Sequence, residues 1–189
     1  EKSIKLMQKE KDYKKQQHGL KLIGNIYFDE NEIPKAIEKW NDSLAYCPKA
    51  SLERCQIHLL MAKAYKHIKN YSLLALQYSH IIQLHESARS DEDTICKYIK
   101  FQAEALTKSL NPRNSLPRTA AKIECNDTCF SIINLYSKYI DIRSVFGGLS
   151  NEKDICIAYL KIGDIYFSYL NEYGNAADSY DRATYTVQY

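Results

Sequence analysis

The stretch that decides the fold is 20-LKLIGNIYFDENEIPKAIEKWNDSLAYCP-48. Apolar residues recur in it at three- and four-residue intervals on both sides of a short polar turn, 29–32, which is the pattern of two amphipathic helices. Pro34 suits the first turn of the second helix, where its missing N–H costs nothing, and Pro48 marks the end of that helix. Gly24 lies where a large side chain would hold the two helices apart. The stretch therefore predicts a closely packed, antiparallel helix pair.

The pattern around Gly24 recurs around Ala62, Ala103 and Gly163, each on an apolar helical face. The expected helix pairs cover 3–48, 51–87, 90–142 and 150–187. A polar connection is expected at 111–126, between the two helices of the third pair. The positions that define the repeat are Gly24, Tyr27, Ala36, Trp40, Pro48, Ala62, Tyr65, Ala103, Gly163, Tyr166, Ala176, Tyr180 and Ala183.

The same periodicity predicts which side chains are buried and where helices begin. Ser51, Ser90 and Ser150 each precede an apolar run and are predicted N-caps. A turn is predicted at 146–148, where two glycines follow a phenylalanine. The second helix of the third pair is expected over 127–142. Residues expected on buried helical faces include Leu6, Tyr13, Leu20, Ile23, Tyr27, Phe130 and Tyr173.

This helix–turn–helix unit resembles the tetratricopeptide repeat (TPR), which is about 34 residues long. The resemblance implies an all-α fold, a helical-repeat superhelix of about four antiparallel helix pairs in one domain over 1–189. It also implies a concave groove lined by the first helix of each pair, the usual binding face of such repeats. Because the sequence starts at Glu1 and ends in a helical pattern at Tyr189, we expect it to be a fragment of a longer chain.

The charge of the chain gathers at its start. The net charge is +3, with 26 Lys and Arg against 23 Asp and Glu. The first fifteen residues hold six of the lysines, so the remainder is balanced and shows no basic stripe of the kind that nucleic-acid binders carry. We expect no nucleic-acid partner, and we interpret the lysine-rich start as a solvated helix face. No apolar run is long enough to span a membrane.

The six cysteines lie mostly within apolar helical faces, which favours reduced, buried thiols in a cytosolic protein. A disulfide framework is an alternative for all six, and a zinc site an alternative for Cys125, Cys129 and a distant histidine. Paired spacing typical of structural zinc sites is missing from the sequence. No motif of a phosphate loop, a nucleophile or a metalloprotease occurs either. The sequence therefore predicts a non-enzymatic protein with no cofactor and no metal.

The predicted function is a protein-binding scaffold or adaptor that holds a partner peptide or helix in the concave groove. Six polar positions on first helices are the candidate binding residues: Lys21, Asn25, His58, Lys63, Lys97 and Gln102. An alternative is self-assembly through the ends of the superhelix.

A second hypothesis is a co-chaperone. One class of TPR proteins grips the terminal carboxylate of chaperone tails with Lys, Asn and Arg side chains on first helices. By spacing, Lys21, Asn25 and Lys97 match that carboxylate clamp. Leu60 and Phe101 occupy two other clamp positions, and an apolar side chain there cannot donate a hydrogen bond to a carboxylate.

Particular strings of the sequence resemble the rapsyn family of cytoplasmic scaffolds. These strings are 19–22 (GLKL), 35–37 (KAI) with Trp40, and 180–183 (YDRA). The resemblance implies clustering of receptors at the postsynaptic membrane, a receptor or cytoskeletal partner, and a cytoplasmic location with peripheral contact of the lysine-rich start with the plasma membrane. The myristoylated glycine, coiled coil and zinc-binding end of that family have no counterpart in these 189 residues.

Overall fold

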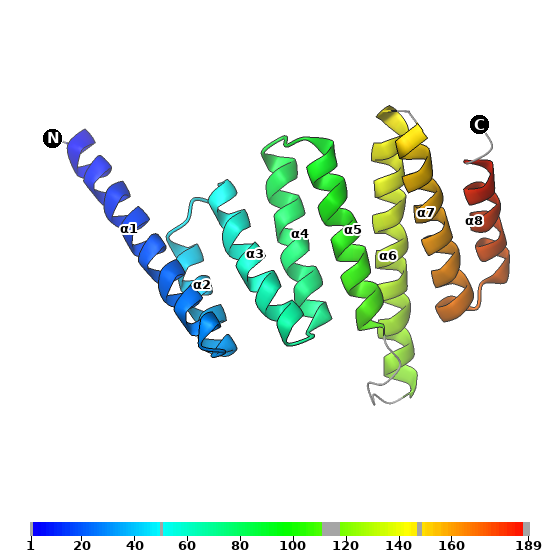
Figure 1. Ribbon diagram of the computed structural model, residues 1–189, viewed down its shortest axis with the longest axis horizontal. Coiled ribbons are helices and arrows are strands. Elements are labelled where there is room, and N and C mark those ends of the chain that lie inside the picture. Colours follow the sequence, from blue (N-terminus) through cyan, green and yellow to red (C-terminus); the bar gives the residue numbers. More distant parts are fainter. Residues whose placement is uncertain (1, 50, 111–117, 147–148, 187–189) are drawn as a thin grey trace. The chain divides into compact units, whose positions relative to one another are not determined.

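The protein is described by a computed structural model that covers residues 2–49, 51–110, 118–146 and 149–186. These residues form eight α-helices and one π-helical turn, and no β-strand occurs among them (Figure 1). The elements are α1 (Lys2–Asp29), α2 (Ile33–Ala45), α3 (Leu52–His67), α4 (Tyr71–Ser87), α5 (Glu92–Ser109), α6 (Arg118–Phe146), α7 (Leu149–Ile165), the π-helical turn η1 (Tyr166–Leu170) and α8 (Tyr173–Tyr185). The chain divides into two compact units, Glu1–Ser90 and Asp91–Tyr189. No described helix combines the length and the hydrophobicity that a membrane-spanning segment requires.

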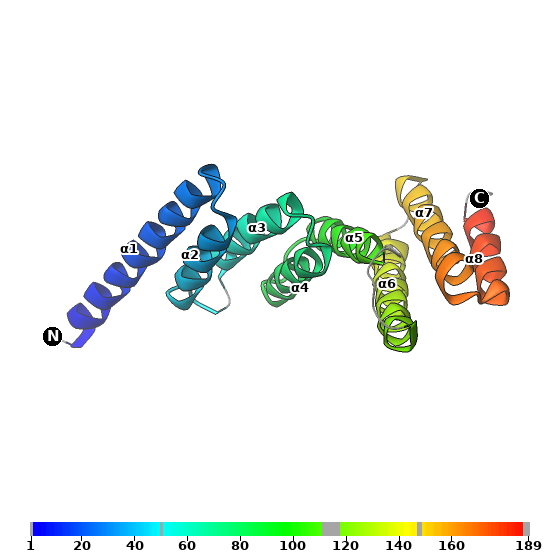
Figure 2. The ribbon, with the colours of Figure 1, turned by 90° about the horizontal axis from the view of Figure 1, so that it is seen from below.

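The first unit consists of two antiparallel helix pairs, α1 with α2 and α3 with α4, and α2 also packs on α3 (Figures 1 and 2). Its core is built around Trp40 of α2, which is 1% exposed. Ile57 and Met61 of α3 pack against the same cluster, together with the partly buried rings of Tyr27 and Phe28 on α1. The apolar face of α2 is thus buried against both α1 and α3.

Gly24 and Gly163 permit the close approach of helices in their pairs. A Cβ atom on Gly24 would lie 2.5 Å from Cδ1 and Nε1 of the Trp40 indole. A Cβ atom on Gly163 would lie 2.5 Å from Cε1 of the Tyr180 ring. The repeat predicted from the sequence therefore has a physical basis at both ends of the chain, because an aromatic ring of the second helix occupies the space that the glycine leaves.

Four of the described turns between helices contain a residue in the left-handed backbone conformation. Four residues that follow a helix have positive φ angles of 51–62°. At the first of these turns the Glu32 N–H donates to the Tyr27 carbonyl over 2.8 Å, the long-range bond of a Schellman motif. The four residues are Asn31, Lys69, Arg89 and Asn171.

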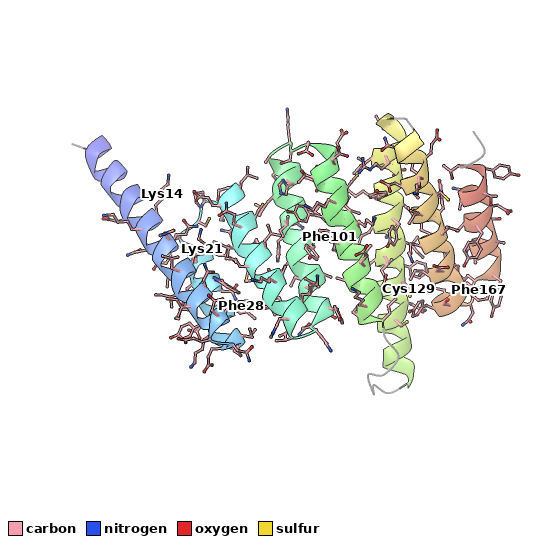
Figure 3. The ribbon with its side chains drawn as sticks, in the orientation of Figure 1. Lys14, Lys21, Phe28, Phe101, Cys129 and Phe167 are labelled. Atoms are coloured by element: carbon pink, nitrogen blue, oxygen red, sulfur yellow. The ribbon has the colours of Figure 1, made fainter. Side chains whose placement is uncertain are left out.

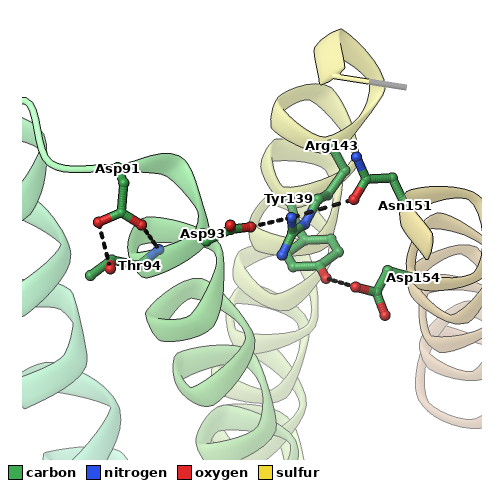
Figure 4. Close-up of polar contacts among 7 residues, drawn as sticks. All are labelled: Asp91, Asp93, Thr94, Tyr139, Arg143, Asn151 and Asp154. Carbon is green, nitrogen blue, oxygen red and sulfur yellow. Dashed lines mark hydrogen bonds and ion pairs between the residues drawn. The ribbon is translucent and has the colours of Figure 1, made fainter. Parts of the chain in front are cut away.

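The second unit pairs α5 with α6 and α7 with α8, and α6 also packs on α7. A polar network joins three of these helices at one end (Figure 4). Arg143 of α6 donates to Asp93 of α5 over 2.5 Å and to Asn151 of α7 over 3.4 Å. The Tyr139 hydroxyl donates to Asp154 of α7 over 3.1 Å, and the Arg143 guanidinium lies 5.6 Å from the centre of the Tyr139 ring.

The expected connection at 111–126 is too long, because α6 begins at Arg118 rather than near residue 127. Two alanines, a lysine and a glutamate in 118–124 are good helix formers, and Pro117 suits a position at the start of a helix. The first helix of the fourth pair is expected to run from Ser150 to about residue 170, but the α-helix α7 ends at Ile165 and continues as the π-helical turn η1. Residues 111–117 and the turn at 147–148 lie outside the described residues.

Of the three predicted N-caps, Ser51 has the predicted position, whereas Ser90 and Ser150 do not cap their helices. Ser51 is the N-cap of α3, but its side chain makes no capping hydrogen bond. Asp91, not Ser90, caps α5, and its carboxylate accepts from the Thr94 N–H over 2.8 Å. Helix α7 begins at Leu149, one residue before Ser150.

Several residues expected to be buried are exposed. Tyr13 is 42% exposed, Ile23 43%, Phe130 44% and Tyr173 61%. A helix in a two-layer repeat buries only part of its apolar stripe, so residues at the edge of the stripe keep contact with solvent. The side chain of Leu6 lies outside the described residues.

The six cysteines are free thiols, four of them buried and two, Cys125 and Cys156, half-buried. Burial, followed by the neighbouring Cys125, raises the pKa of the Cys129 thiol to about 12. A thiol with such a pKa is neutral at physiological pH and a poor nucleophile.

Candidate functional site

A groove of about 440 Å³ lies between α1 and α3 in the first unit. Its exposed lining is mainly apolar, with polar groups at the edges. The lining residues are Lys21, Asn25, Gln56, Leu59, Leu60 and Lys63. We refer to these six residues as the α1–α3 groove.

Helical spacing brings the six side chains together. Lys21 and Asn25 are four residues apart on α1 and therefore share one face of that helix. Gln56, Leu59, Leu60 and Lys63 follow the i, i+3, i+4, i+7 spacing that forms one stripe along α3. The two stripes line the same groove, and Lys63 of α3 reaches across to the Phe28 ring of α1.

The buried indole of Trp40 orients Asn25. Its Nε1–H lies 3.2 Å from Asn25 Oδ1 and 3.3 Å from the carbonyl of Lys21. Because the indole nitrogen can only donate, the amide oxygen of Asn25 must face it. The side-chain amide nitrogen of Asn25 therefore points away from the indole and is left as a hydrogen-bond donor.

Lys63 is positioned by an aromatic ring. Its Nζ lies 4.8 Å from the centre of the Phe28 ring, within the range of a cation–π interaction. Phe28 and Lys21 both project from α1 (Figure 3), and the Phe28 ring lies 5.8 Å from that of Trp40. The ammonium group of Lys63 is therefore held at the edge of the groove by the core of the first unit.

The chemistry of the groove combines an apolar floor with positive edges. Leu59 is 38% exposed, and Leu60 is half-buried beside it. Lys21 and Lys63 supply the positive charge among the lining residues, and Asn25 supplies an oriented donor. Such an arrangement can bury an apolar side chain while pairing with a carboxylate next to it.

Three of the six predicted binding residues come together in this groove, namely Lys21, Asn25 and Lys63. His58 does not. It was expected at the surface but is only 6% exposed, with Nδ1 2.9 Å from Gln77 Oε1 and its ring 4.9 Å from that of His80. Residue 58 lies on the opposite side of α3 from residues 56, 59, 60 and 63, since each residue turns the helix by 100°.

Lys97 and Gln102 belong to the second unit, on α5. Lys97 is exposed, and its Nζ lies 5.8 Å from the ring of Tyr98 and 6.0 Å from that of Phe101. Gln102 is half-buried. Lys21 and Asn25 thus share a groove, whereas Lys97 lies in the other compact unit.

Reasoning from the sequence missed Gln56, Leu59 and Leu60 as parts of the site. Leu60 counted only as a failed clamp position, and Gln56 and Leu59 were not among the candidate residues. The signal was available in the i, i+3, i+4, i+7 spacing from Gln56 to Lys63, which places both leucines between the polar edges.

No family model and no curated protein matches the chain. Among solved structures, BtubC (BKLC) from P. vanneervenii is similar, with a TM-score of 0.54 and 12% identity over 90% of this chain. This chain spans 62% of the length of BtubC. Two structures of MamA align with TM-scores of 0.31 and 0.33, both at 15% identity, over 87% and 90% of this chain and 94% and 91% of theirs. The likeness to BtubC and the helix pairs themselves show that the chain has a TPR-like, all-α helical-repeat fold.

Proposed function

We propose that the protein is a non-enzymatic scaffold or adaptor that binds a peptide or helical segment of a partner protein in the α1–α3 groove. One observation carries the proposal: Leu59 and Leu60 form an apolar floor in a groove that Lys21 and Lys63 also line, and the ammonium group of Lys63 is held over the Phe28 ring. Binding sites for proteins combine apolar contact area with a few oriented polar groups at the edge.

The chemistry of the groove selects the partner. An apolar side chain of the ligand would cover Leu59 and Leu60, and an aspartate, glutamate or terminal carboxylate next to it would pair with Lys21 or Lys63. Asn25 would donate to a backbone carbonyl or carboxylate through the amide nitrogen that Trp40 leaves outward. We therefore expect a short segment that is both apolar and acidic.

The test is selection of peptides from a random displayed library on the immobilised protein. The variant Lys21→Glu/Lys63→Glu reverses both charges of the groove. Its matched control is Lys14→Glu/Lys66→Glu, which makes the same charge change at exposed positions of α1 and α3 outside the groove. We expect apolar–acidic peptides that bind the parent and the control equally and the groove variant at least tenfold more weakly. Selected peptides that bind all three proteins equally would overturn the proposal.

A second candidate function is capture of a free terminal carboxylate, as in a co-chaperone. The oriented amide of Asn25 beside Lys21 favours it. Lys97 is the third residue of this hypothesis and stays a prediction. Amidation of the C-terminus of a selected peptide should abolish binding under this hypothesis and leave it unchanged when internal acidic residues are recognised.

A more specific form of the scaffold proposal is a rapsyn-like role in receptor clustering. It includes a cytoplasmic location, peripheral membrane contact and receptor or cytoskeletal partners, and it rests on the sequence resemblance.

Self-association is an alternative use of the same fold. Sedimentation velocity over a range of protein concentrations tests it, since self-association predicts a sedimentation coefficient that rises with concentration.

A further inference from the structure

A second concave site lies on the other side of α3. It is a cavity of about 270 Å³ between α3 and α4, within the first unit. Helical geometry places Arg54 and His58 on the face of α3 opposite to the α1–α3 groove. The lining residues are Lys49, Arg54, His58, His80, Gln83, Leu84 and Ser87, and we call them the basic pocket.

The basic pocket gathers positive charge from three segments. Lys49 comes from the connection between α2 and α3, Arg54 and His58 from α3, and His80 from α4. No carboxylate is among the described residues that line it. Grouped cations repel one another, and an anion placed among them relieves that repulsion.

Arg54 is fixed in place by the end of α2. Its Nη1 donates to the carbonyl of Leu44 over 3.0 Å and to the carbonyl of Cys47 over 3.1 Å. These bonds hold the planar guanidinium at the pocket, so a ligand does not have to order the Arg54 side chain when it binds. Arginine held in this way suits the paired oxygens of a phosphate-type anion.

The two histidines add titratable donors. The Gln77 amide oxygen accepts a hydrogen bond from His58 Nδ1–H, so Nε2 is the nitrogen that can take up a proton. Burial lowers the pKa of His58, and the neighbouring His80 and Arg54 act in the same direction. The ring is therefore neutral near pH 7 until an opposite charge enters the pocket. The charged and titratable groups around it are Arg54 on α3, His80 on α4 and Lys49 on the preceding connection.

We propose that the basic pocket binds a tetrahedral oxyanion of the phosphate class, either free or as the phosphoryl group of a larger ligand. Lys49 and Arg54 supply the permanent charge, and His58 supplies a further charged donor when it is protonated. Affinity for an anion of constant charge rises as the pH falls, because anion binding and protonation of His58 favour each other.

The test is an NMR titration of the imidazole resonances with inorganic phosphate at constant ionic strength, with chloride as reference. We expect saturable shifts of His58 and His80 with phosphate and none with chloride. Sulfate, whose charge does not change over this range, should bind more tightly at pH 5.5 than at pH 7.5. A peptide with a single phosphoserine distinguishes the sources: tighter binding than inorganic phosphate indicates a phosphorylated partner, and weaker binding indicates a free anion.

Variants of the basic pocket test whether phosphate binding depends on the pocket residues rather than on the stability of the fold or on charge elsewhere in the protein. Lys49→Gln/His80→Gln should weaken phosphate binding at least tenfold, and Lys49→Gln alone, at an exposed side chain, should weaken it measurably in a folded protein. The control His18→Gln/Lys66→Gln removes one histidine and one lysine at exposed positions outside the pocket and should leave affinity unchanged. Non-saturable shifts, or equal affinity in Lys49→Gln and the parent, would overturn the proposal.

Discussion

At the residue scale, Gly24 and Gly163 set how closely the helices of their pairs approach, since each gives its space to an aromatic ring of the partner helix. The two rings are also held by hydrogen bonds to the residue that follows the glycine. Trp40 Nε1–H donates to Asn25, and the Tyr180 hydroxyl donates to Asp164 over 3.1 Å. The first and the last helix pair therefore share one arrangement: a glycine, an aromatic ring packed against it, and an oxygen acceptor on the next residue that binds the ring's N–H or O–H.

We expect Gly24→Leu and Gly163→Leu each to lower the free energy of unfolding by about 1–3 kcal/mol, because the new side chain must displace a packed ring. Chemical denaturation followed by circular dichroism measures the change. The control is Gly19→Ala, where a Cβ atom would meet nothing within 4 Å. That change should stabilise the protein by about 0.5–1 kcal/mol, since alanine favours a helix over glycine. Equal stability of all the variants would contradict the packing role of the two glycines.

Lys69 has a φ angle of 57° at the turn after α3, a conformation that costs a residue with a side chain about 1–2 kcal/mol. We expect Lys69→Gly to stabilise the protein by about 0.5–1 kcal/mol, after the greater entropy of glycine in the unfolded chain is subtracted. Lys66→Gly, inside α3, should instead destabilise by about 1 kcal/mol. Thermal melting temperatures that move in the same direction for both variants would count against the turn geometry.

At the element scale, the seam between α3 and α4 contains the buried His58. Its pKa lies below the ordinary value of about 6.5 in the folded state. The folded protein therefore binds fewer protons at His58 than the unfolded chain. Stability from this group is complete above pH 6.5 and declines as the pH falls below that value. Unfolding free energies measured from pH 7.5 to 5 should show this decline, and His58→Gln should flatten it. A parallel pH dependence in the two proteins would exclude His58 as its source.

The network at the end of α5, α6 and α7 depends on its arginine more than on its acid. The Asp93 side chain is 80% exposed and that of Arg143 20%, so solvent screens the ion pair on the acidic side. We expect Asp93→Asn to cost less than about 1 kcal/mol. Arg143→Met should cost about 1–2 kcal/mol, because it loses the contact with the Tyr139 ring and the hydrogen bond to Asn151. Denaturation of the two variants gives the comparison, and a larger loss for Asp93→Asn would contradict it.

At the scale of the whole molecule, the helix pairs could be predicted because their signals are local. The glycine–aromatic spacing, the polar turn at 29–32 and Pro34 each depend on neighbours in the sequence. The start of α6 at Arg118 was missed because two prolines close to it outweighed a short run of helix-forming residues. Whether a helix extends over such a run depends on the tertiary contacts that the helix makes, which local sequence does not reveal.

The candidate site could be predicted only in part. Lys21, Asn25 and Lys63 were found from their place on first helices. The burial of His58 was not predicted, because histidine is a polar residue that sequence reasoning places at the surface. Its hydrogen-bond partner Gln77 lies on another helix, nineteen positions away. Lys97 was grouped with Lys21 by repeat spacing, whereas contacts divide the chain into two compact units between them.

The central claim is that the α1–α3 groove binds a peptide, and Trp40 provides a direct reporter of it. Trp40 is the single tryptophan of the sequence, so the indole N–H gives one cross-peak in a ¹H–¹⁵N NMR spectrum. That N–H donates to Asn25, a lining residue of the groove. Titration with a selected apolar–acidic peptide should shift this cross-peak, together with the amides of Lys21, Leu59, Leu60 and Lys63, and the shifts should vanish in Lys21→Glu/Lys63→Glu. Saturable shifts confined to other residues, with the Trp40 indole unmoved, would contradict the account.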